Sequence, residues 1–384
     1  MKIEFLLKAE VSDLYFSMIK EEATFRCVDE NITIHIIQEH ADKTSKHFPY
    51  VAFRCLSELV VGEEIYDFID NFINDKFLIT ENSKIKLPFI IKNGHVKDGV
   101  VTDREVIDIE GNIRHDFSPT LEMLPDEIQS ICKDMKLHLN KVLKRFTSIL
   151  IWFQGLESSH QPFKMSPSVY WRVKEGSYYL LPFPKQGSFS VGMRKGISWR
   201  ESDVDDLEKI WSTKDIDEPL AHELWREALA VSKSSPRSGF LILCTALETG
   251  VKQHISNVVP DAEWLITSIQ SPPIAKILNK YFPILHSDST IVTDWTKLTK
   301  EINAKCVKMI DYRNTLAHSG NFDEAIPLNE YFKLVRNILY IIDALEGHEW
   351  AKNRVDLHMK KLLDWTVTED DKSLGSTVVI KPMW

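Results

Sequence analysis

Hydrophobic residues recur at strand-like spacing through much of the first two hundred residues, and at helical spacing through most of the remaining chain. Short runs rich in β-branched and aromatic residues predict strands near 3–8, 32–37, 50–56, 85–91 and 104–109. Two further runs, 169–173 and 178–183, flank Lys174-Glu175-Gly176 and predict a hairpin. This half of the chain therefore has the pattern of a mixed α+β domain.

Two helices are also expected in this first part, over 62–75 and 125–153. The second is long, and we expect it to brace the first domain. Its apolar residues keep helical spacing at Ile128, Cys132, Met135, Leu139, Val142, Phe146, Ile149 and Phe153. The acidic run from Ser202 to Glu208 is typical of a linker or of an exposed helix start.

From residue 218 onward the pattern is almost wholly helical. The main helices are expected at about 219–233, 236–257, 294–318 and 327–346, with irregular turns around 261–281. The sequence thus predicts an α+β N-terminal domain over 1–205, an all-α four-helix bundle over 215–350, and a C-terminal tail over 351–384. The tail is ambiguous, with one candidate strand at 375–380.

Composition narrows the class of protein. The chain has 384 residues, of which 43% are hydrophobic and 27% charged, enough for two domains with hydrophobic cores. Its most apolar run, 148–153, is far too short for a membrane span, and the start of the chain has no signal-peptide pattern. We therefore expect a cytoplasmic protein with no membrane partner. The net charge of -9 argues against bulk electrostatic coating of nucleic acid, so any such contact must be local.

Five cysteines are scattered along the sequence and never form a Cys-x-x-Cys pair. This spacing fits reduced core thiols better than a disulfide framework or a zinc site. No cofactor is expected.

Candidate chemistry lies at the end of the helix expected over 294–318. Its apolar stripe consists of Leu298, Ile302, Cys306, Met309, Leu316 and Ala317. Arg313 falls in the middle of this stripe, where a guanidinium is costly unless an acceptor meets it. The expected acceptor is Glu248, at the edge of the buried stripe of the helix that follows Pro236.

Three polar residues, Asp311, Asn314 and His318, lie on a neighbouring face of the same helix. His318 stands at the helix end, where unpaired carbonyls and the negative dipole end favour an imidazolium. A histidine of this kind suits general acid–base work on a ribose 2′-hydroxyl. An arginine fork can hold a phosphate and stabilise the charge that builds on it.

The segment Asp311-Tyr312-Arg313-Asn314-Thr315-Leu316-Ala317-His318, the Gly320 after it and the Ala246-Leu247-Glu248 segment resemble a HEPN domain. The likeness is to the variant found in Apea-like anti-phage proteins. It rests on the Arg-Asn-x-x-x-His motif and on the order of the helices, and it covers about 218–350. The rest of the chain resembles no family that we can name.

The resemblance implies a metal-independent endoribonuclease that acts as a homodimer and leaves a 2′,3′-cyclic phosphate. Carried over by position, Arg313 and His318 are catalytic and Asn314 orients them, with Glu248 and Asp311 in support. The substrate class is RNA, transfer RNA included. The N-terminal domain is then expected to sense an unknown trigger, a phage protein or a small molecule, in a bacterial abortive-infection or toxin-like system.

Two alternatives stay open. The helical domain could be an inactive dimerisation or RNA-binding module attached to an N-terminal binding domain. An N-terminal metal-dependent nuclease would instead need a carboxylate cluster, and Asp67 with Asp70, or Asp108 with Glu110, does not make a convincing one.

Weaker signals have ordinary explanations that we favour. The functional interpretations that we set aside are a metal site at His35, His40 and His47, a phosphate-binding side of the long helix at Lys133, Lys136, Lys141, Lys144 and Arg145, and a stacking surface at Tyr170, Trp171, Tyr178 and Tyr179.

Overall fold

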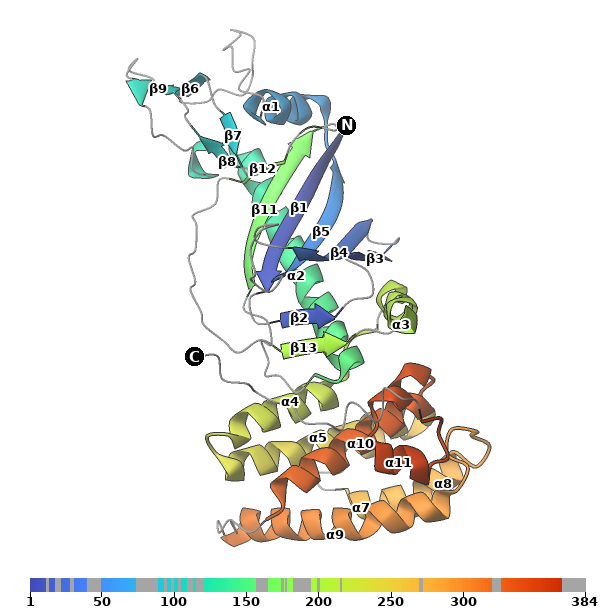
Figure 1. Cartoon of the computed structure of the whole chain (residues 1–384). Coiled ribbons are helices and arrows are strands. Elements are labelled where there is room, and N and C mark those ends of the chain that lie inside the picture. The colour runs from blue at the N-terminus through green and yellow to red at the C-terminus, as the bar shows by residue number, and fades with distance from the viewer. Residues whose placement is uncertain are drawn as a thin grey trace, which may run out of the picture. The chain divides into compact units, whose positions relative to one another are not determined.

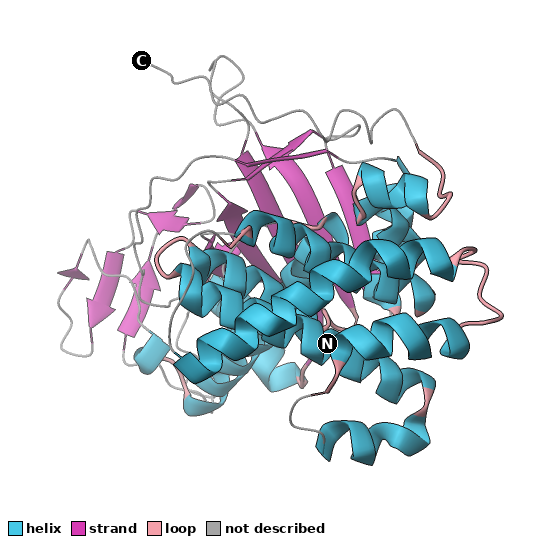
Figure 2. Ribbon diagram, turned by 90° about the horizontal axis from the view of Figure 1, so that it is seen from below, coloured by secondary structure: helices cyan, strands magenta, loops and turns pink. Residues whose placement is uncertain are grey.

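The structure is a computed structural model. It describes residues 1–11, 14–17, 22–27, 31–39, 50–73, 89–92, 95–97, 100–102, 105–108, 113–114, 121–156, 165–173, 176, 178–181, 195–198, 201–214, 216–268, 272–319 and 326–367. Two compact units make up the chain. A strand-rich unit comprises 1–148 and 163–216, and a helical unit comprises 149–162 and 217–384. Figure 2 distinguishes the strands of the first from the helices of the second.

A six-stranded antiparallel sheet forms the centre of the strand-rich unit, in the order β12-β11-β1-β5-β4-β3 (Figure 1). The strands of this sheet are β1 (Lys2–Val11), β3 (Glu22–Cys27), β4 (Ile32–Glu39), β5 (Tyr50–Val60), β11 (Met165–Val173) and β12 (Tyr179–Leu180). Smaller sheets pair β10 (Ile113–Arg114), β9 (Glu105–Asp108) and β6 (Phe89–Lys92), then β13 (Lys195–Ser198) with β2 (Leu14–Ser17), and β7 (His95–Lys97) with β8 (Val100–Thr102).

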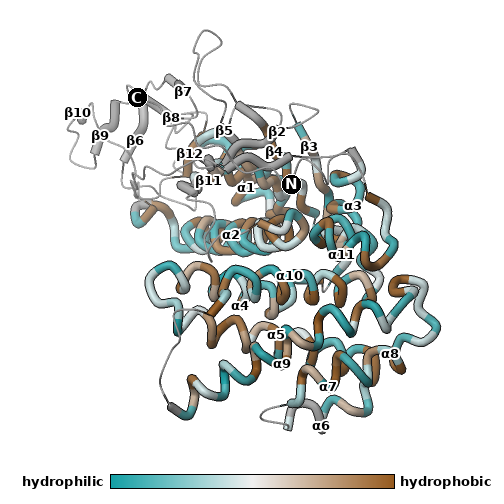
Figure 3. Tube along the Cα trace, turned by 60° about the horizontal axis from the view of Figure 1, so that its bottom comes forward, coloured by the Kyte–Doolittle hydropathy of each residue, from teal (hydrophilic) through white to brown (hydrophobic). Residues whose placement is uncertain are grey.

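Alternate residues of the large sheet are buried, which explains the strand-like alternation of the sequence. Phe5 pairs with Trp171 across β1 and β11, and both side chains are fully buried. The helix α2 (Asp126–Gln154) contributes Phe146, whose ring lies 5.2 Å from that of Phe25 on β3 and 6.2 Å from that of Phe53 on β5. In Figure 3 hydrophobic and hydrophilic residues alternate along α2, as expected of a helix with one buried side.

The strand-rich unit also holds α1 (Glu63–Ile73), the 3₁₀ turn Leu121–Met123 and α3 (Glu201–Ser212). Helix α3 contains the acidic run that could have been a linker. Its apolar side is buried at Leu207, Ile210 and Trp211, and the Trp211 ring meets Phe146 at 5.2 Å. The run is therefore the first part of a packed helix, with Asp203 buried.

The helical unit has four main helices: α4 (Leu220–Ser232), α5 (Pro236–Val258), α9 (Trp295–Ser319) and α10 (Leu328–Leu345). Between α5 and α9 lie η2 (Pro260–Ala262), α6 (Glu263–Ser268), α7 (Ile274–Lys276), the π-helical turn η3 (Ile277–Tyr281) and α8 (Phe282–Leu285). After α10 come η4 (Glu349–Arg354) and α11 (Leu357–Leu362). Among the residues described, no helix has the length and apolar character needed to cross a membrane.

Close packing of α5 against α10 depends on Gly250. A Cβ at this position would lie 2.4 Å from Leu339 Cδ2 and 3.2 Å from Ala221 Cβ. Helix α10 is buried on nearly all sides, because α4, α5 and α9 pack against it. It is therefore the central helix of the unit.

The last turn of α2 belongs to the helical unit, so the prediction that α2 serves the first domain holds only as far as Ser148. Gly155, at φ +62°, ends the helix in a Schellman motif. Its N–H donates to Trp152 O at 3.0 Å, and Leu156 N–H donates to Ile151 O at 3.1 Å. Trp152 and Phe153 are buried in the helical unit.

The coarse expectation of an antiparallel sheet followed by a mostly helical region is confirmed. The strand-rich unit extends to Ile216, beyond the expected end of the first domain at residue 205. Part of the expected tail, up to about Leu363, is packed into the helical unit. Asp356 caps α11 by accepting from Met359 N at 2.9 Å, and its carboxylate also accepts from Asn337 Nδ2 at 2.5 Å. The candidate strand at 375–380 lies outside the described residues.

Candidate functional site

The residues of the motif occupy the C-terminal part of α9. This helix buries Leu298, Ile302, Cys306, Met309 and Leu316, as the stripe predicted. Ala317 is exposed, however, so the stripe ends one residue earlier than expected.

Arg313 is half-buried, and its Nη1 donates to the Oδ1 atom of Asn314 at 3.1 Å. Glu248 on α5 does not pair with it. Instead Glu248 Oε1 lies 3.0 Å from Lys252 Nζ, one turn further along the same helix. The predicted buried Arg313–Glu248 ion pair is therefore wrong. A carboxylate at the edge of the buried stripe pairs at a lower free-energy cost with a flexible lysine four residues along the same helix than with an arginine on another helix.

The charges of Arg313 and Glu248 both act on the thiol of Cys244. Burial raises the pKa of Cys244 to about 12, while the charge of Arg313 acts to lower it and that of Glu248 to raise it. Cys244 belongs to α5, so Arg313 lies near that helix. Arg313 and Glu248 are thus neighbours without being partners.

Tyr312, directly before Arg313, meets α10. Its ring lies 6.3 Å from that of Tyr331, edge to face, and Tyr331 in turn lies 5.9 Å from Phe240 on α5. Burial raises the pKa of Tyr331 to about 12, and the nearby Tyr312 hydroxyl raises it further. These rings anchor the motif-bearing part of α9 to α5 and α10.

His318 is exposed, as are Asp311 and Thr315. Five residues separate Arg313 from His318, which at about 100° per residue turns their side chains about 140° apart around α9. Within one chain the guanidinium thus points toward the bundle and the imidazole toward solvent. The two side chains therefore diverge within one chain.

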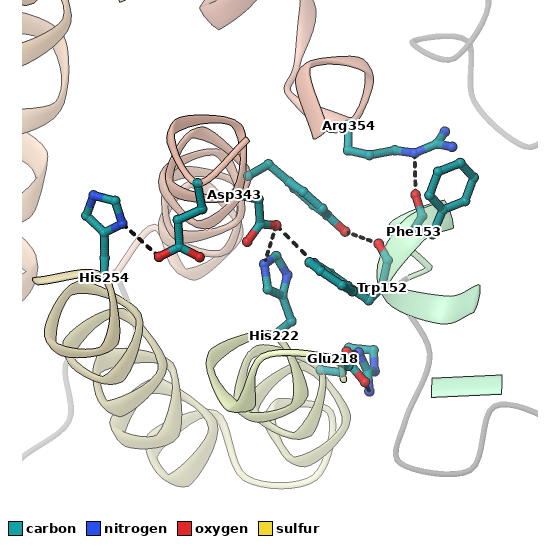
Figure 4. Close-up of polar contacts among 10 residues, drawn as sticks. Trp152, Phe153, Glu218, His222, His254, Asp343 and Arg354 are labelled. Carbon is teal, nitrogen blue, oxygen red and sulfur yellow. Dashed lines mark hydrogen bonds and ion pairs between the residues drawn. The ribbon is translucent and has the colours of Figure 1, made fainter. Parts of the chain in front are cut away.

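A buried polar cluster that the sequence did not predict lies elsewhere in the helical unit (Figure 4). Asp343 Oδ2 on α10 accepts from Trp152 Nε1 at 2.9 Å and lies 2.9 Å from His222 Nε2 on α4. Tyr340 O–H donates to Trp152 O at 2.9 Å. Burial raises the pKa of Tyr340 to about 12, which keeps its hydroxyl protonated.

A second cluster joins the ends of α5 and α10. His254 Nδ1 lies 2.8 Å from Glu346 Oε1, and His254 Nε2 lies 2.7 Å from His286 Nε2. A carboxylate can only accept, so His254 carries its proton on Nδ1 and accepts from His286 Nε2–H. Burial, followed by the charge of His254, lowers the pKa of His286 to about 4, so His286 is neutral at pH 7.

Only spacing could have pointed to these clusters, because their members are far apart in sequence. Polar residues on apolar helix stripes, such as His222, His254 and Asp343, were the available signal. Their partners come from other helices, which no single-sequence pattern identifies.

Comparisons with protein-family models, with curated proteins and with solved structures found no match to this chain. The resemblance to HEPN domains therefore rests on the sequence motif and the order of the helices alone.

The weaker signals have ordinary surroundings where the structure describes them. His35 Nδ1 contacts Glu22 Oε1 at 2.6 Å and Thr24 Oγ1 at 3.0 Å on the neighbouring strand, while His40 and His47 lie outside the described residues. Within the described part of the chain, no group of three or more histidine, cysteine or acidic residues is placed to hold a metal ion. Arg145 donates to the carbonyls of Thr213 and Ile216, which makes it a structural residue.

Proposed function

We propose that the helical unit is an endoribonuclease that cuts RNA by attack of a ribose 2′-hydroxyl on the adjacent phosphate. The observation that carries the proposal is that one helix end carries both a half-buried Arg313, oriented by Asn314, and an exposed His318. Imidazole moves the protons and guanidinium stabilises the phosphorane charge, so the chemistry is metal-independent.

The reaction balances without a further reactant. The 2′-oxygen forms a bond to phosphorus as its proton passes to a neutral imidazole, and the bond from phosphorus to the 5′-oxygen breaks as an imidazolium returns a proton to it. The products are a 2′,3′-cyclic phosphate and a 5′-hydroxyl. One histidine for two proton transfers favours a homodimer in which two copies of His318 face one phosphate.

The proposed biological setting is a bacterial anti-phage or toxin-like effector, with the strand-rich unit as its sensor. An RNA-cutting unit joined to a second unit of more than one hundred residues makes sense when cleavage is conditional. RNA, transfer RNA included, is the proposed substrate.

A second candidate function is an inactive dimerisation or RNA-binding module. The divergence of Arg313 and His318 around α9 favours it, because a monomer would not bring the two groups together. The same experiment separates the candidates: purified protein is incubated with total RNA and with transfer RNA in EDTA, beside the His318→Ala variant. Cleavage that depends on His318 supports the nuclease. RNA binding without cleavage supports the module.

A further inference from the structure

Helix α2 is one continuous helix that serves two cores. Its residues up to Ser148 belong to the strand-rich unit, where Phe146 packs among aromatic rings. Its last turn, Ile149–Gln154, belongs to the helical unit. We call this last turn, together with Gly155 and Leu156, the α2 plug.

We infer that the α2 plug is the regulatory input of the helical unit: its seating in the core determines, through α10, how tightly the motif-bearing end of α9 is held. The regulatory meaning rests on the proposed function, whereas the physical coupling does not.

The plug is held by specific contacts as well as by burial. Trp152 is 1% exposed and Phe153 is 0% exposed. Tyr340 O–H and Arg354 Nε donate to the carbonyls of Trp152 and Phe153, at 2.9 and 2.6 Å. Trp152 O already accepts from Gly155 N–H, so Tyr340 adds a second bond there, and Arg354 supplies a donor for Phe153 O. The α2 plug is therefore held both by burial and by specific hydrogen bonds from the helical unit.

Aromatic rings also pack against the α2 plug. The Trp152 ring lies 5.0 Å from that of Trp350 and 5.1 Å from that of His348, edge to face in both cases. Gly155 completes the fit, because a Cβ there would lie 3.1 Å from both Arg336 Nη2 and Tyr340 Oη. Little room remains for the plug to shift without moving its neighbours.

Helix α10 contacts both the α2 plug and the motif-bearing end of α9. Tyr340 and Asp343 bind the plug near one end of α10, and Tyr331 meets Tyr312 near the other. Tyr331 and Asp343 are twelve residues apart, which is about 18 Å along a helix. A close-packed interior transmits displacement, and α10 is buried along this whole length. A change at the plug must therefore be accommodated where α10 holds the residue next to Arg313.

Two Trp→Phe substitutions in the full chain test this inference. Trp152→Phe removes the indole N–H that Asp343 accepts and keeps an aromatic ring at this position. Trp211→Phe is the matched control: it is also fully buried, but it lies in the strand-rich unit and its Nε1 makes no hydrogen bond among the described residues. Tyr340→Phe is a milder second variant, because it removes only the bond to Trp152 O.

Hydrogen–deuterium exchange under native conditions is the readout, measured at the amides of 312–318 and at those of 243–251 on α5. We expect Trp152→Phe and Tyr340→Phe to raise exchange at 312–318 severalfold more than at 243–251, and Trp211→Phe to leave both unchanged. Equal increases at both segments would mean general loosening and would overturn the inference, as would no change at 312–318 in either plug variant.

Wild-type RNA cleavage is measured in parallel. Absence of His318-dependent cleavage removes the proposed function and with it the regulatory meaning, while the exchange result decides the coupling independently.

Discussion

Arg313 Nη1 donates to Asn314 Oδ1 at 3.1 Å, so each of these neighbouring residues orients the other. The guanidinium is thereby aligned by a neutral amide instead of being neutralised by a carboxylate. Its full charge remains available to a phosphate, which suits an electrostatic role at a developing negative charge.

RNA cleavage is expected to survive chelation, because imidazole and guanidinium replace a bound cation in the proposed chemistry. Product ends analysed by mass spectrometry should carry a 2′,3′-cyclic phosphate. An oligonucleotide with deoxyribose at the scissile position should remain intact. Activity that EDTA abolishes and Mg²⁺ restores would contradict this mechanism.

Arg313→Ala should separate chemistry from stability. Because Arg313 has no ion pair with Glu248, its removal strands no buried carboxylate, and we expect the free energy of unfolding to fall by only about 1 kcal/mol or less. Cleavage should fall by roughly 100-fold or more. Urea denaturation and a cleavage assay measure the two quantities. Lys308→Ala, an exposed cation on the same helix, is the control and should change neither one. An unstable Arg313→Ala protein would point to a buried partner after all.

Mixed dimers test the shared site. Arg313→Ala and His318→Ala subunits, each inactive alone, should regain part of the activity when unfolded together and refolded as a mixture, because the shared cleft then holds one intact Arg313 and one intact His318 from different subunits. Light scattering gives the oligomeric state of the same samples. A fully active monomer would rule out a site built from two copies.

Acid should destabilise the helical unit through His286. Its pKa is lowered to about 4 in the folded protein, against 6.5 for the ordinary group, so between these values the unfolded chain binds a proton that the folded one does not. This contribution is fully present above pH 6.5 and is lost as the pH falls toward 4. His254 and Glu346 are the groups that face His286 in the cluster.

His286→Gln should therefore flatten the dependence of unfolding free energy on pH in this window. His358→Gln, on an exposed residue of α11, is the control and should keep the wild-type slope. Equal slopes in the His286→Gln and wild-type proteins would show that another group titrates instead.

Asp356 should be a determinant of stability despite its place in the expected tail. Asp356→Ala removes the N-cap of α11 and the acceptor of Asn337, which should cost about 1–2 kcal/mol. Asp356→Asn retains a capping oxygen and should cost less than half as much. Thermal melts of both variants measure this difference. Equal losses would mean that the acceptor for Asn337, which the amide nitrogen of asparagine cannot replace, matters more than the cap.

Local pattern was sufficient for the main helices and for several strands, but it did not predict β3 (Glu22–Cys27), β13 (Lys195–Ser198) or α11 (Leu357–Leu362). The helices expected at 125–153, 236–257, 294–318 and 327–346 are α2, α5, α9 and α10, because hydrophobic spacing and the positions of Pro236 and Gly320 act over a few residues. The buried stripes of α2 and α9 followed from the same spacing, apart from Ala317. The role of the motif remains a prediction that chemistry must test.

The amino-acid sequence by itself determined where the main helices and several strands lie, which sides of the helices are apolar, and that an arginine and a histidine lie near the end of one helix. Only the tertiary structure decided that Arg313 does not pair with Glu248, that Asp343 lies against both Trp152 and His222, and that α2 ends inside the helical unit. The physical reason is range. Periodicity and capping depend on neighbours within one or two turns, whereas the partner of a buried polar group is chosen by which helices pack together, about 190 residues apart for Trp152 and Asp343.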